Sequence, residues 1–361
     1  MEALVRDLAR QQAAAGHDVH ILTVEQGTDR AVRLEDDEGA VVHRLCLPLP
    51  LQAPVNPAAV FRSQKILGEL RPDVVHAHAG TISPLSLGVA KLARGRGIPV
   101  AITFHSALNR SYRVLKPLYL AGGWHHASVA WSAVSRGAAD PIEKMLGTDV
   151  AVISNGIDLE GWRPADTPPS APLPLRCVAT MRLVPRKRVT GLIEVVARAM
   201  DDLPPDAIEL DIFGTGPDLW RARNWVRHRK LEASIRLRGQ VPRAELKANY
   251  QQAHVFCSTA TREAFGIAAL EARVTGLVVV ARRGTGLDEF TRDGYDSVMV
   301  DDDATFARQL VRLASHPEWL ATLQENARTD LPDFGFGRLL EGAGSEYARA
   351  EAIGRRSSTL V

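Results

Sequence analysis

HVFCSTATREAFGIAALEARVTG, residues 254–276, runs from a short apolar segment through a polar loop into a helix pattern. It carries two glutamates: Glu263 lies in the loop, and Glu271 lies inside a helix that Gly266 opens and Gly276 closes. Helical side chains lean toward the helix N-terminus, so Glu271 should point back toward the loop of Glu263. A strand followed by such a loop and helix is the repeating unit of a parallel α/β fold.

The start of this helix is a natural seat for phosphate. The backbone N–H groups of Phe265, Gly266 and Ile267 lie between the two carboxylates, where the helix itself offers them no acceptor. Two carboxylates that flank an anion site indicate a ligand with hydroxyls at both ends and phosphate in the middle, which is the shape of a nucleotide sugar. The alternative interpretation is a pair of solvated glutamates at a helix end.

Outward from this stretch, short β-branched runs alternate with helix patterns, which predicts α/β layers with parallel sheets. Strands are expected in the first half at 17–24, 40–45, 73–77, 100–104 and 127–131, and in the second half at 175–180, 208–213, 235–238, 255–257, 277–281 and 297–300. Helices are expected at 2–14, 82–94, 191–200, 218–229 and 243–253. Ligands in open α/β sheets bind at the carboxyl ends of the strands, so a site is expected at that edge.

A proline-rich segment divides the chain, whose 361 residues are too many for one ordinary core. Residues 164–174, PADTPPSAPLP, have the composition of an interdomain linker. They separate an N-terminal Rossmann-like domain, residues 1–163, from a C-terminal Rossmann-like domain, residues 175–333, and residues 334–361 follow as a further helix pattern. Two such domains on a linker predict a cleft between them.

The composition describes a soluble globular protein, 45% hydrophobic and 24% charged. A net charge of only +2 gives no support to nucleic-acid binding. Cys46, Cys177 and Cys257 are far apart in apolar runs and are interpreted as buried reduced thiols of a cytoplasmic protein. No apolar stretch is long enough to span a bilayer and no signal-peptide pattern is present, so we expect a cytoplasmic protein, with peripheral contact at the inner face of the membrane left open.

The first residues are unusual for a Rossmann-like domain, which begins with a strand and a glycine-rich turn. This chain opens on the helix expected at 2–14. In a doubly wound sheet the first strand is central, so its absence leaves the neighbouring strands with unpaired ladder groups. We therefore expect an N-terminal domain without its first strand and glycine-rich loop, and a reading frame that extends upstream of residue 1.

The linker and the glutamate pair together resemble the retaining glycosyltransferases of family four, which have the GT-B fold of two Rossmann-like domains facing across a cleft. The resemblance covers almost the whole chain, and its strongest block is Glu263-x7-Glu271 with Phe265-Gly266 inside it. It implies that Glu263 binds hydroxyls of the donor sugar, that Glu271 binds the ribose of the nucleotide, and that the backbone from Phe265 to Ile267 binds the diphosphate. It also implies that the helix pattern at 334–361 returns to the N-terminal domain.

A second block, MRLVPRKR, follows the first strand of the C-terminal domain. The family has an arginine and a lysine five residues apart there, which are Arg182 and Lys187 in this chain. Cations at these positions neutralise the leaving nucleoside diphosphate as charge builds in the transition state. Met181 and Arg188 stand where the family has glycines, so the backbone path can differ, and Arg186 or Arg188 is a candidate to share the phosphate role. A solvated basic loop is the alternative.

Histidines follow two strands of the first half, in His76-Ala-His78 and at His105. No carboxylate or cysteine spacing accompanies them, so they do not predict a metal site. The resemblance implies that His105 faces the donor sugar near its anomeric carbon; a structural histidine is the alternative. His76 and His78 are interpreted as structural or cleft-lining, and the pair at 125–126 as structural.

Glycine turns follow other strands. The resemblance places Gly214 against the donor nucleotide, and Gly239 and Val241 beside its base. Residues 284–289 resemble a degenerate glycine-rich loop near the sugar, and residues 155–158 are interpreted as a hinge.

The resemblance implies a retaining, metal-independent glycosyltransferase that moves a hexose-type sugar from a UDP- or GDP-sugar to a hydroxyl acceptor. The predicted catalytic residues are His105, Arg182, Lys187 and Glu263, and no cofactor is expected besides the donor substrate. The acceptor is a small molecule, a glycan or a lipid-linked molecule. Residues 109–120 mix cations with large apolar groups, so they suit either an anionic or lipid-linked acceptor at a membrane surface or an ordinary half-exposed helix.

Two alternatives remain open at this stage. One is a nucleotide-sugar epimerase of the same GT-B architecture. The other is a catalytically impaired nucleotide-sugar-binding protein, which the missing N-terminal loop and Met181 both suggest.

Overall fold

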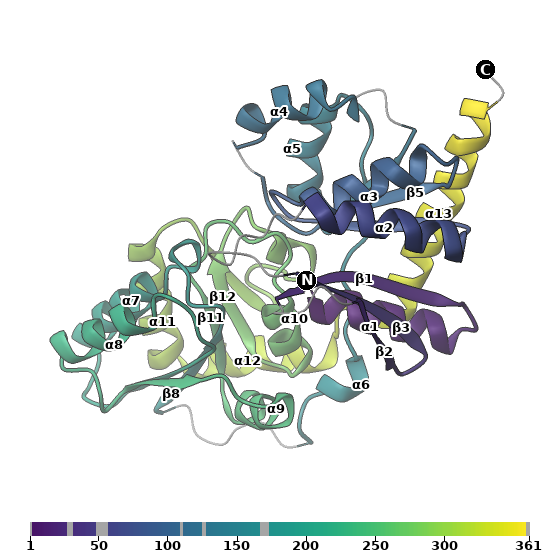
Figure 1. The fold of residues 1–361 in the computed structure, drawn as a ribbon. Helices are drawn as coiled ribbons and strands as arrows, with labels where there is room; N and C mark the ends of the chain where they lie inside the picture. The colour runs from purple at the N-terminus through teal and green to yellow at the C-terminus, as the bar shows by residue number, and fades with distance from the viewer. Residues whose placement is uncertain are drawn as a thin grey trace. The chain divides into compact units, whose positions relative to one another are not determined.

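The computed structural model describes residues 2–26, 32–47, 57–108, 111–124, 128–166 and 173–358 (Figure 1). The chain divides into two compact units. The first consists of Met1–Gly156 and Phe334–Val361, and the second of Ile157–Asp333. Each unit has its own sheets and its own hydrophobic core.

The first unit contains two sheets. Strands β1 (Val19–Gln26), β3 (Ala40–Leu47) and β2 (Val32–Asp37) form one sheet in the order β1-β3-β2, with β1 and β3 parallel. Strands β4 (Val75–Ala79), β5 (Val100–Phe104), β6 (Ala130–Ala133) and β7 (Ala151–Val152) form a parallel sheet in that order. The helices of this unit are α1 (Glu2–Ala14), α2 (Pro57–Leu70), α3 (Pro84–Arg94), α4 (Tyr112–Ala121), α5 (Arg136–Leu146) and α13 (Phe336–Ser358).

The two sheets of the first unit are covered by shared helices. β1 and β4 each lie at the edge of their own sheet. Helix α2 contacts β3 through Leu45, Ala59 and Ile66, and it also packs against α3. On β5 and β6, α13 packs Ala350 against Ala101 and Ala130, and it also contacts α1. Residues from both ends of the chain therefore complete the first unit.

The second unit contains one six-stranded sheet in which every strand is parallel to its neighbours, in the order β10-β9-β8-β11-β12-β13. Its strands are β8 (Leu175–Thr180), β9 (Ile208–Phe213), β10 (Ile235–Gly239), β11 (Val255–Ser258), β12 (Val278–Arg282) and β13 (Ser297–Val300). Its helical elements are α6 (Leu159–Trp162), η4 (Pro185–Lys187), α7 (Val189–Asp201), α8 (Leu219–His228), α9 (Arg243–Gln252), α10 (Ile267–Val274), η5 (Gly286–Glu289), α11 (Asp303–Ser315) and α12 (Pro317–Thr329).

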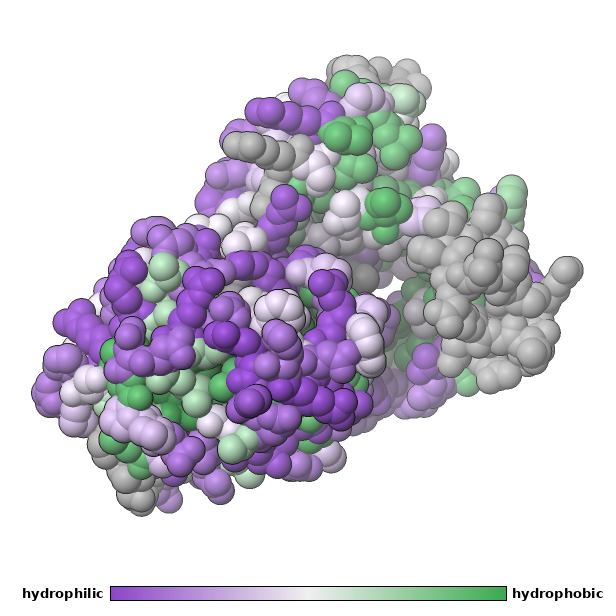
Figure 2. Space-filling model, turned by 90° about the vertical axis from the view of Figure 1, so that its left-hand side faces the viewer, coloured by the Kyte–Doolittle hydropathy of each residue, from purple (hydrophilic) through white to green (hydrophobic). Residues whose placement is uncertain are grey.

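Helices cover both faces of this sheet, as continuous apolar strands require. Figure 1 shows α7, α8 and α11 on one side and α9 and α10 on the other. The buried cluster on the first side includes Leu192, Val226 and Phe306. Hydrophilic side chains cover most of the face of the second unit that Figure 2 turns toward the viewer. Helices therefore pack on both faces of the sheet, and the loops that follow its strands lie at its carboxyl edge.

The local predictions agree with many element bounds. The helix at 2–14 and the strands at 100–104, 175–180, 208–213 and 297–300 have the predicted bounds, and the other predicted strands are shifted by one to three residues. Strand β2 and helix α2 were not predicted. The sequence of β2, VRLEDD, is too polar for a strand signal, and it pairs only at the sheet edge.

Cys177 and Cys257 are free and buried, as predicted. The side chain of Cys46, the histidines at 125–126 and the linker residues 167–172 lie outside the described residues. Within the described ranges, no helix combines the length and the apolar character that a membrane span needs.

Candidate functional site

The carboxyl edge of the six-stranded sheet gathers the predicted residues of the second unit. All six strands are parallel, so the loops that follow them lie at one edge. Residues 181–188 follow β8, Gly214 follows β9, Gly239 and Val241 end and follow β10, and residues 259–266 follow β11. The sequence-predicted residues of the second unit therefore come together, although they are spread over more than 80 positions.

Lys187 and Glu263 form an ion pair at this edge. Lys187 ends η4, and its Nζ donates to a carboxylate oxygen of Glu263, which lies in the loop before α10. The two side chains are only 17% and 14% exposed, so the charges are shielded from water on most sides. The backbone carbonyl of Glu263 accepts the N–H of Gly286 at 2.9 Å. A Cβ at Gly286 would lie 2.1 Å from the carbonyl oxygen of Ala264, so only glycine allows this loop to support the Glu263 loop.

The N-terminus of α10 offers unsatisfied backbone donors. Gly266 is the N-cap residue in the left-handed conformation, with φ 92°, and no side chain caps the helix. The first intrahelical bonds run from Ala269 and Leu270 to the Gly266 carbonyl, so the N–H groups of Ile267 and Ala268 precede the ladder. The Phe265 ring is buried against Phe290 at 5.4 Å between ring centroids. The Phe265 ring therefore belongs to the packed interior and is not presented to a ligand.

Glu271, one turn into α10, has a different partner from Glu263. Its carboxylate is 13% exposed and lies 3.2 Å from a guanidinium nitrogen of Arg243 on α9. The same guanidinium lies over the Trp162 ring, 5.2 Å from its centroid. Burial, and secondarily the charge of Glu271, raises the pKa of the neighbouring Tyr250 well above its usual range. The two glutamates are thus held at separate positions by two cations.

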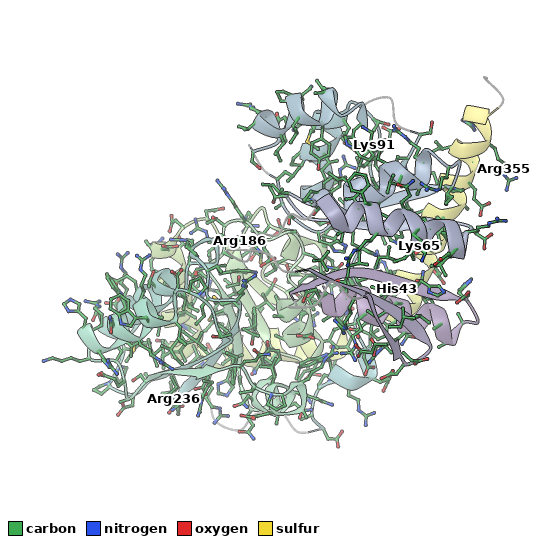
Figure 3. All side chains as sticks on the ribbon, in the orientation of Figure 1. His43, Lys65, Lys91, Arg186, Arg236 and Arg355 are labelled. Carbon is green, nitrogen blue, oxygen red and sulfur yellow. The ribbon has the colours of Figure 1, made fainter. Side chains whose placement is uncertain are left out.

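The remaining cations of the MRLVPRKR block differ in what they contact. Arg182 and Arg186 are exposed, and neither has an ion-pair partner among the residues that the structure describes (Figure 3 labels Arg186). Arg188 instead makes two hydrogen bonds to Asp303, at 3.0 and 2.6 Å, and donates to the Thr259 carbonyl at 3.1 Å. Arg186 is consequently better placed than Arg188 to meet an added anion.

The two departures from the family pattern are accommodated in different ways. Met181 is buried and belongs to the main core of the second unit. Arg188 adopts the left-handed conformation, φ 57° and ψ 43°, which glycine favours. Gly214 is needed for packing, because a Cβ there would lie 2.0 Å from the Met181 carbonyl oxygen. The N–H of Gly214 donates to the Gly239 carbonyl at 2.6 Å, which ties these two turns together.

His105 belongs to the first unit, directly after β5. Its N–H donates to the Ala79 carbonyl at 2.8 Å, and its Nε2 atom lies 2.9 Å from Nδ1 of His78 on β4. Burial, and secondarily His78, holds the pKa of His105 well below its usual range. His105 is therefore a neutral imidazole at neutral pH.

The sequence did not reveal the contacts of His76 and His78. The His76 ring lies against His78, tilted by 37° with 4.1 Å between centroids, and it hydrogen-bonds Tyr347 of α13 at 3.0 Å. That contact joins residues 271 positions apart, so no local pattern could have predicted it. His78 near the end of β4 and His105 directly after β5 both lie at the carboxyl ends of neighbouring parallel strands, and this was the available signal for their contact. Within the described ranges, no group of three or more His, Cys, Asp or Glu side chains is arranged to hold a metal ion.

Two family models match the chain in succession. The model described as Glycosyltransferase Family 4 matches residues 1–160, and the model described as Glycosyl transferases group 1 matches residues 176–330. The second match contains the whole carboxyl-edge cluster of Arg182, Lys187, Glu263 and Glu271.

Similar proteins are named as glycosyltransferases. The chain is 31% identical to a D-inositol 3-phosphate glycosyltransferase of Streptomyces bingchenggensis over 59% of this chain and 51% of that protein, so this match spans about half of the relative. It is 28% identical to a phosphatidyl-myo-inositol mannosyltransferase of Mycobacterium leprae, over 74% of this chain and 72% of that protein. Neither relative is named as an epimerase.

Solved structures with the GT-B fold are also similar. Sucrose-phosphate synthase from Thermosynechococcus elongatus has a TM-score of 0.78 at 21% identity and covers 96% of this chain and 92% of its own. HepE from Anabaena, in complex with UDP and glucose, has a TM-score of 0.76 at 17% identity and covers 96% of this chain and 95% of its own. The chain therefore belongs to the family-four, group 1 glycosyltransferases and has their GT-B fold.

Proposed function

We propose that this protein is a retaining, metal-independent glycosyltransferase that moves a hexose-type sugar from a UDP- or GDP-sugar to a hydroxyl acceptor. The observation that carries the proposal is the shielded Lys187–Glu263 ion pair beside the uncapped start of α10, in a chain of this family. The helix start and the lysine match the diphosphate of a nucleotide sugar, and the carboxylate matches its hydroxyls.

The diphosphate is proposed to bind at the start of α10. The N–H groups of Ile267 and Ala268 and the positive end of the helix dipole favour an anion there. Lys187 supplies a fixed charge, and Arg182, which is exposed, can turn toward a bound phosphate. These groups can neutralise a diphosphate without a metal ion, so no cofactor besides the donor is proposed.

The carboxylates are proposed to bind the two sugars of the donor. When a donor enters, Lys187 exchanges part of its bond to Glu263 for the phosphate, and Glu263 then accepts hydroxyls of the hexose. Glu271, held by Arg243, accepts hydroxyls of the ribose, and the turn at Gly239 and Val241 lies beside the base. HepE, a protein with the same fold, was solved with UDP and glucose, which supports a donor of this class.

We propose that transfer retains the anomeric configuration because the acceptor hydroxyl attacks from the same face of the donor sugar from which the diphosphate leaves. The acceptor hydroxyl forms its bond to the anomeric carbon as the bond to the leaving phosphate breaks, and the phosphate oxygen takes the acceptor's proton. Arg182 and Lys187 stabilise the charge that develops on the diphosphate. His105, neutral and buried, contacts the sugar beside the anomeric carbon. We propose that residues 1–163 carry the acceptor side and residues 175–333 the donor side.

The acceptor is proposed to be a small molecule, a glycan or a lipid-linked molecule. Two relatives are named for inositol-containing acceptors, which makes an inositol phosphate and phosphatidylinositol the first to try. Helix α4 supports peripheral membrane contact at the cytoplasmic face, because Val114 and Leu118 are 80% and 68% exposed next to Arg113 and Lys116. Figure 2 shows hydrophobic side chains at the surface of the first unit, in its upper part.

A ligand panel followed by a transfer assay tests the proposed function. UDP-, GDP- and ADP-sugars are added in a thermal-shift assay, and the correct donor at 100 times its dissociation constant should stabilise the fold by about 2.7 kcal/mol. Release of UDP or GDP is then measured with an inositol phosphate or with phosphatidylinositol vesicles. Stabilisation without acceptor-dependent release would indicate a binding protein, and release of free sugar without an acceptor would indicate the epimerase. No stabilisation by any nucleotide sugar would overturn the proposal.

A further inference from the structure

His78 and His105 form a half-buried hydrogen-bonded pair at the carboxyl end of β4 and β5. Nδ1 of His78 lies 2.9 Å from Nε2 of His105, and the ring centroids are 5.1 Å apart with the planes tilted by 43°. The contact occupies Nε2 of His105. No hydrogen-bond partner of its Nδ1 atom is found in the described part of the chain, so Nδ1 is the atom left for a ligand.

We propose that His78 is a positioning residue: its hydrogen bond to Nε2 fixes the orientation and the tautomer of the His105 ring, so that Nδ1 meets the donor sugar in one protonation state. The proposal rests on the role of His105 in the proposed function. Only one proton lies between the two facing nitrogens, so the ring that donates it decides whether Nδ1 of His105 carries the remaining proton. Without this partner the His105 ring can flip and exchange tautomers.

His78 is itself held by a chain of side chains from both ends of the first unit. The His76 ring lies against it, with 4.1 Å between centroids and the planes tilted by 37°. His76 hydrogen-bonds Thr103 through Nε2 at 2.7 Å and Tyr347 through Nδ1 at 3.0 Å, and Gln12 of α1 donates to Tyr347 at 2.8 Å. Because the Gln12 amide donates, the Tyr347 hydroxyl is free to donate to Nδ1, and Nε2–H of His76 donates to Thr103.

This hydrogen bond requires that the rings of His78 and His105 are both neutral, and burial lowers both of their pKa values. Burial lowers the pKa of His78 to about 4 and that of His76 well below its usual range. A protonated His78 would disfavour a second proton on His105, whose pKa is lowered first by burial and then by His78. At neutral pH each ring therefore carries one proton, and one of these two protons lies between the facing nitrogens.

The closest structural match to this pair serves as its control. His20 on β1 and His43 on β3 form the same contact, from Nδ1 to Nε2, at 2.8 Å, with 5.1 Å between centroids and planes tilted by 42° (Figure 3 labels His43). In this second pair His20 contributes the Nδ1 atom, as His78 does in the pair with His105. It lies in the other sheet of the first unit and has no part in the proposed site.

The test compares His78→Leu, His78→Asn and His20→Leu in the full chain. Leucine keeps the volume and removes the hydrogen bond, whereas the amide of asparagine places a polar atom where Nδ1 was. UDP release from UDP-glucose and GDP release from GDP-mannose are measured with the accepted acceptor. We expect His78→Leu to lower kcat on the order of 10- to 100-fold with KM for the donor unchanged, as misplacement of a contacting group does. His78→Asn should recover most of the loss, and His20→Leu should retain wild-type kcat.

A second measurement does not depend on activity. Long-range ¹H–¹⁵N NMR of the full chain labelled in histidine reports which nitrogen of each ring carries the proton. We expect a single tautomer for His105 in the wild type and a mixture in His78→Leu, with the melting temperature recorded for every variant. A wild-type kcat in His78→Leu, an equal loss in His20→Leu, or an unchanged single tautomer would each overturn the proposal. An inactive wild type with a single His105 tautomer would contradict the proposed function and leave the hydrogen-bonded pair in place.

Discussion

At the scale of single residues, Lys187 and Glu263 are already paired in the structure without a ligand. Lys187 and Glu263 neutralise each other in a position where both are mostly shielded from water. Two opposite charges that are shielded from water attract each other more strongly than two exposed ones. A ligand that takes the place of one partner must therefore offer a group that satisfies the other partner. A nucleotide sugar offers phosphate charge for Lys187 and hydroxyl donors for Glu263.

Removing either member should therefore impair transfer more than folding. We expect Lys187→Ala and Glu263→Ala each to lower kcat/KM on the order of 100-fold or more, because each removes a group aimed at the transition-state charge or at the sugar. Steady-state kinetics with the selected donor measures the loss. Lys65→Ala, from the exposed Lys65–Glu69 pair at 3.7 Å, is the matched control and should leave kcat/KM unchanged. Normal transfer by both site variants would show that the site assignment is wrong.

Arg188 combines a strained backbone with a favourable side chain. Its left-handed conformation favours glycine, while its guanidinium binds Asp303 and the Thr259 carbonyl. Both Arg188→Gly and Arg188→Ala lose the contacts, but only glycine relieves the strain. We expect Arg188→Gly to be more stable than Arg188→Ala by about 1 kcal/mol, the reverse of the order in a helix. Urea unfolding measures both, and equal stabilities would contradict the strain.

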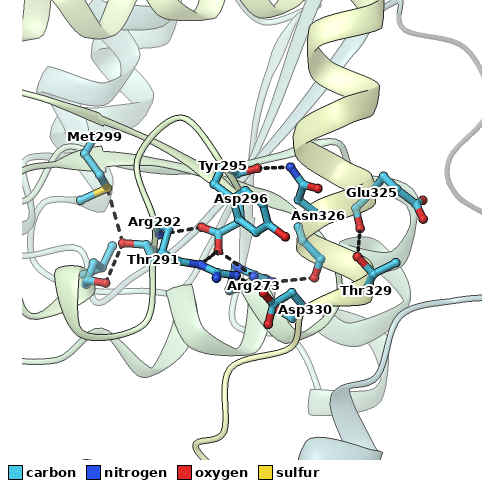
Figure 4. A network of polar contacts seen from close by, with 12 residues as sticks. Arg273, Thr291, Arg292, Tyr295, Asp296, Met299, Glu325, Asn326, Thr329 and Asp330 are labelled. Carbon is cyan, nitrogen blue, oxygen red and sulfur yellow. Dashed lines mark hydrogen bonds and ion pairs between the residues drawn. The ribbon is translucent and has the colours of Figure 1, made fainter.

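At the scale of elements, α10 is anchored by a buried guanidinium. Arg273 on α10 pairs with Asp296 at 2.8 Å, with both side chains only 1% exposed, and it donates to the carbonyls of Ala327 and Asp330 at the end of α12 (Figure 4). The helix that carries Glu271 and begins at the proposed phosphate seat is thus fixed at its far end. The position of the N-terminus depends on this anchor, because α10 has only eight residues.

Loss of the anchor should destabilise the second unit strongly. We expect Arg273→Met to lower the free energy of unfolding by about 3–5 kcal/mol, because it leaves the Asp296 carboxylate buried without its cation. Chemical denaturation monitored by tryptophan fluorescence measures the change. Arg292 contacts the same carboxylate at 3.4 Å but is 55% exposed, so Arg292→Met is the control and should cost much less. Similar losses in the two variants would show that the buried pair is not what anchors α10.

Helix α4 is the element proposed to contact a membrane. Its exposed Val114 and Leu118 lie among Arg113 and Lys116, which suits an anionic bilayer surface. We expect cosedimentation with phosphatidylglycerol vesicles that weakens with added salt and is lost in the double variant Val114→Glu, Leu118→Glu. Trp220→Glu, at a site 71% exposed on α8, should bind like the wild type. Wild-type binding by the α4 variant would favour an ordinary half-exposed helix.

At the scale of the whole molecule, buried histidines link stability to pH. His76, His78 and His105 have pKa values below the ordinary value near 6.5 in the folded chain, first of all because they are buried. Between pH 6.5 and about 4 the unfolded chain therefore binds more protons at His78 than the folded chain does. The stabilisation from the neutral rings is complete above pH 6.5 and is lost as the pH falls through this window.

This linkage predicts a marked acid sensitivity. We expect the free energy of unfolding to fall between pH 7 and pH 5, with His78 alone contributing about 2 kcal/mol. Two carboxylates remain ionised in this range. Hydrogen bonds from Arg6 and Arg10 lower the pKa of Asp37. At Asp211 burial raises the pKa, but Arg236 and Arg238 together lower it below its ordinary value. Urea titrations at several pH values measure the slope, which His78→Asn should reduce and the exposed His316→Gln should not. A flat profile in the wild type would show that the imidazoles are not kept neutral.

Local sequence was sufficient for the elements with strong periodic signals. Runs such as 175–180 and 208–213 were predicted as strands because apolar residues recur in them at the spacing of a half-buried or buried strand, and the structure buries these apolar positions. Local sequence also placed Arg182, Lys187, Gly214 and Glu263 after strands. In a parallel sheet that position alone brings side chains to one edge.

Pairing between distant residues was decided only by tertiary structure. The division of the first unit into two sheets, the bond of Glu271 to Arg243, and the contact of His76 with Tyr347 all depend on which elements pack together. So does the anchoring of Arg188 by Asp303, 115 positions away. Sequence by itself determined the α/β class, most strands and the family, because these follow from local periodicity and short motifs. The partners that hold each site residue were set by the packed fold, because contact energies between distant segments exist only after the chain has closed.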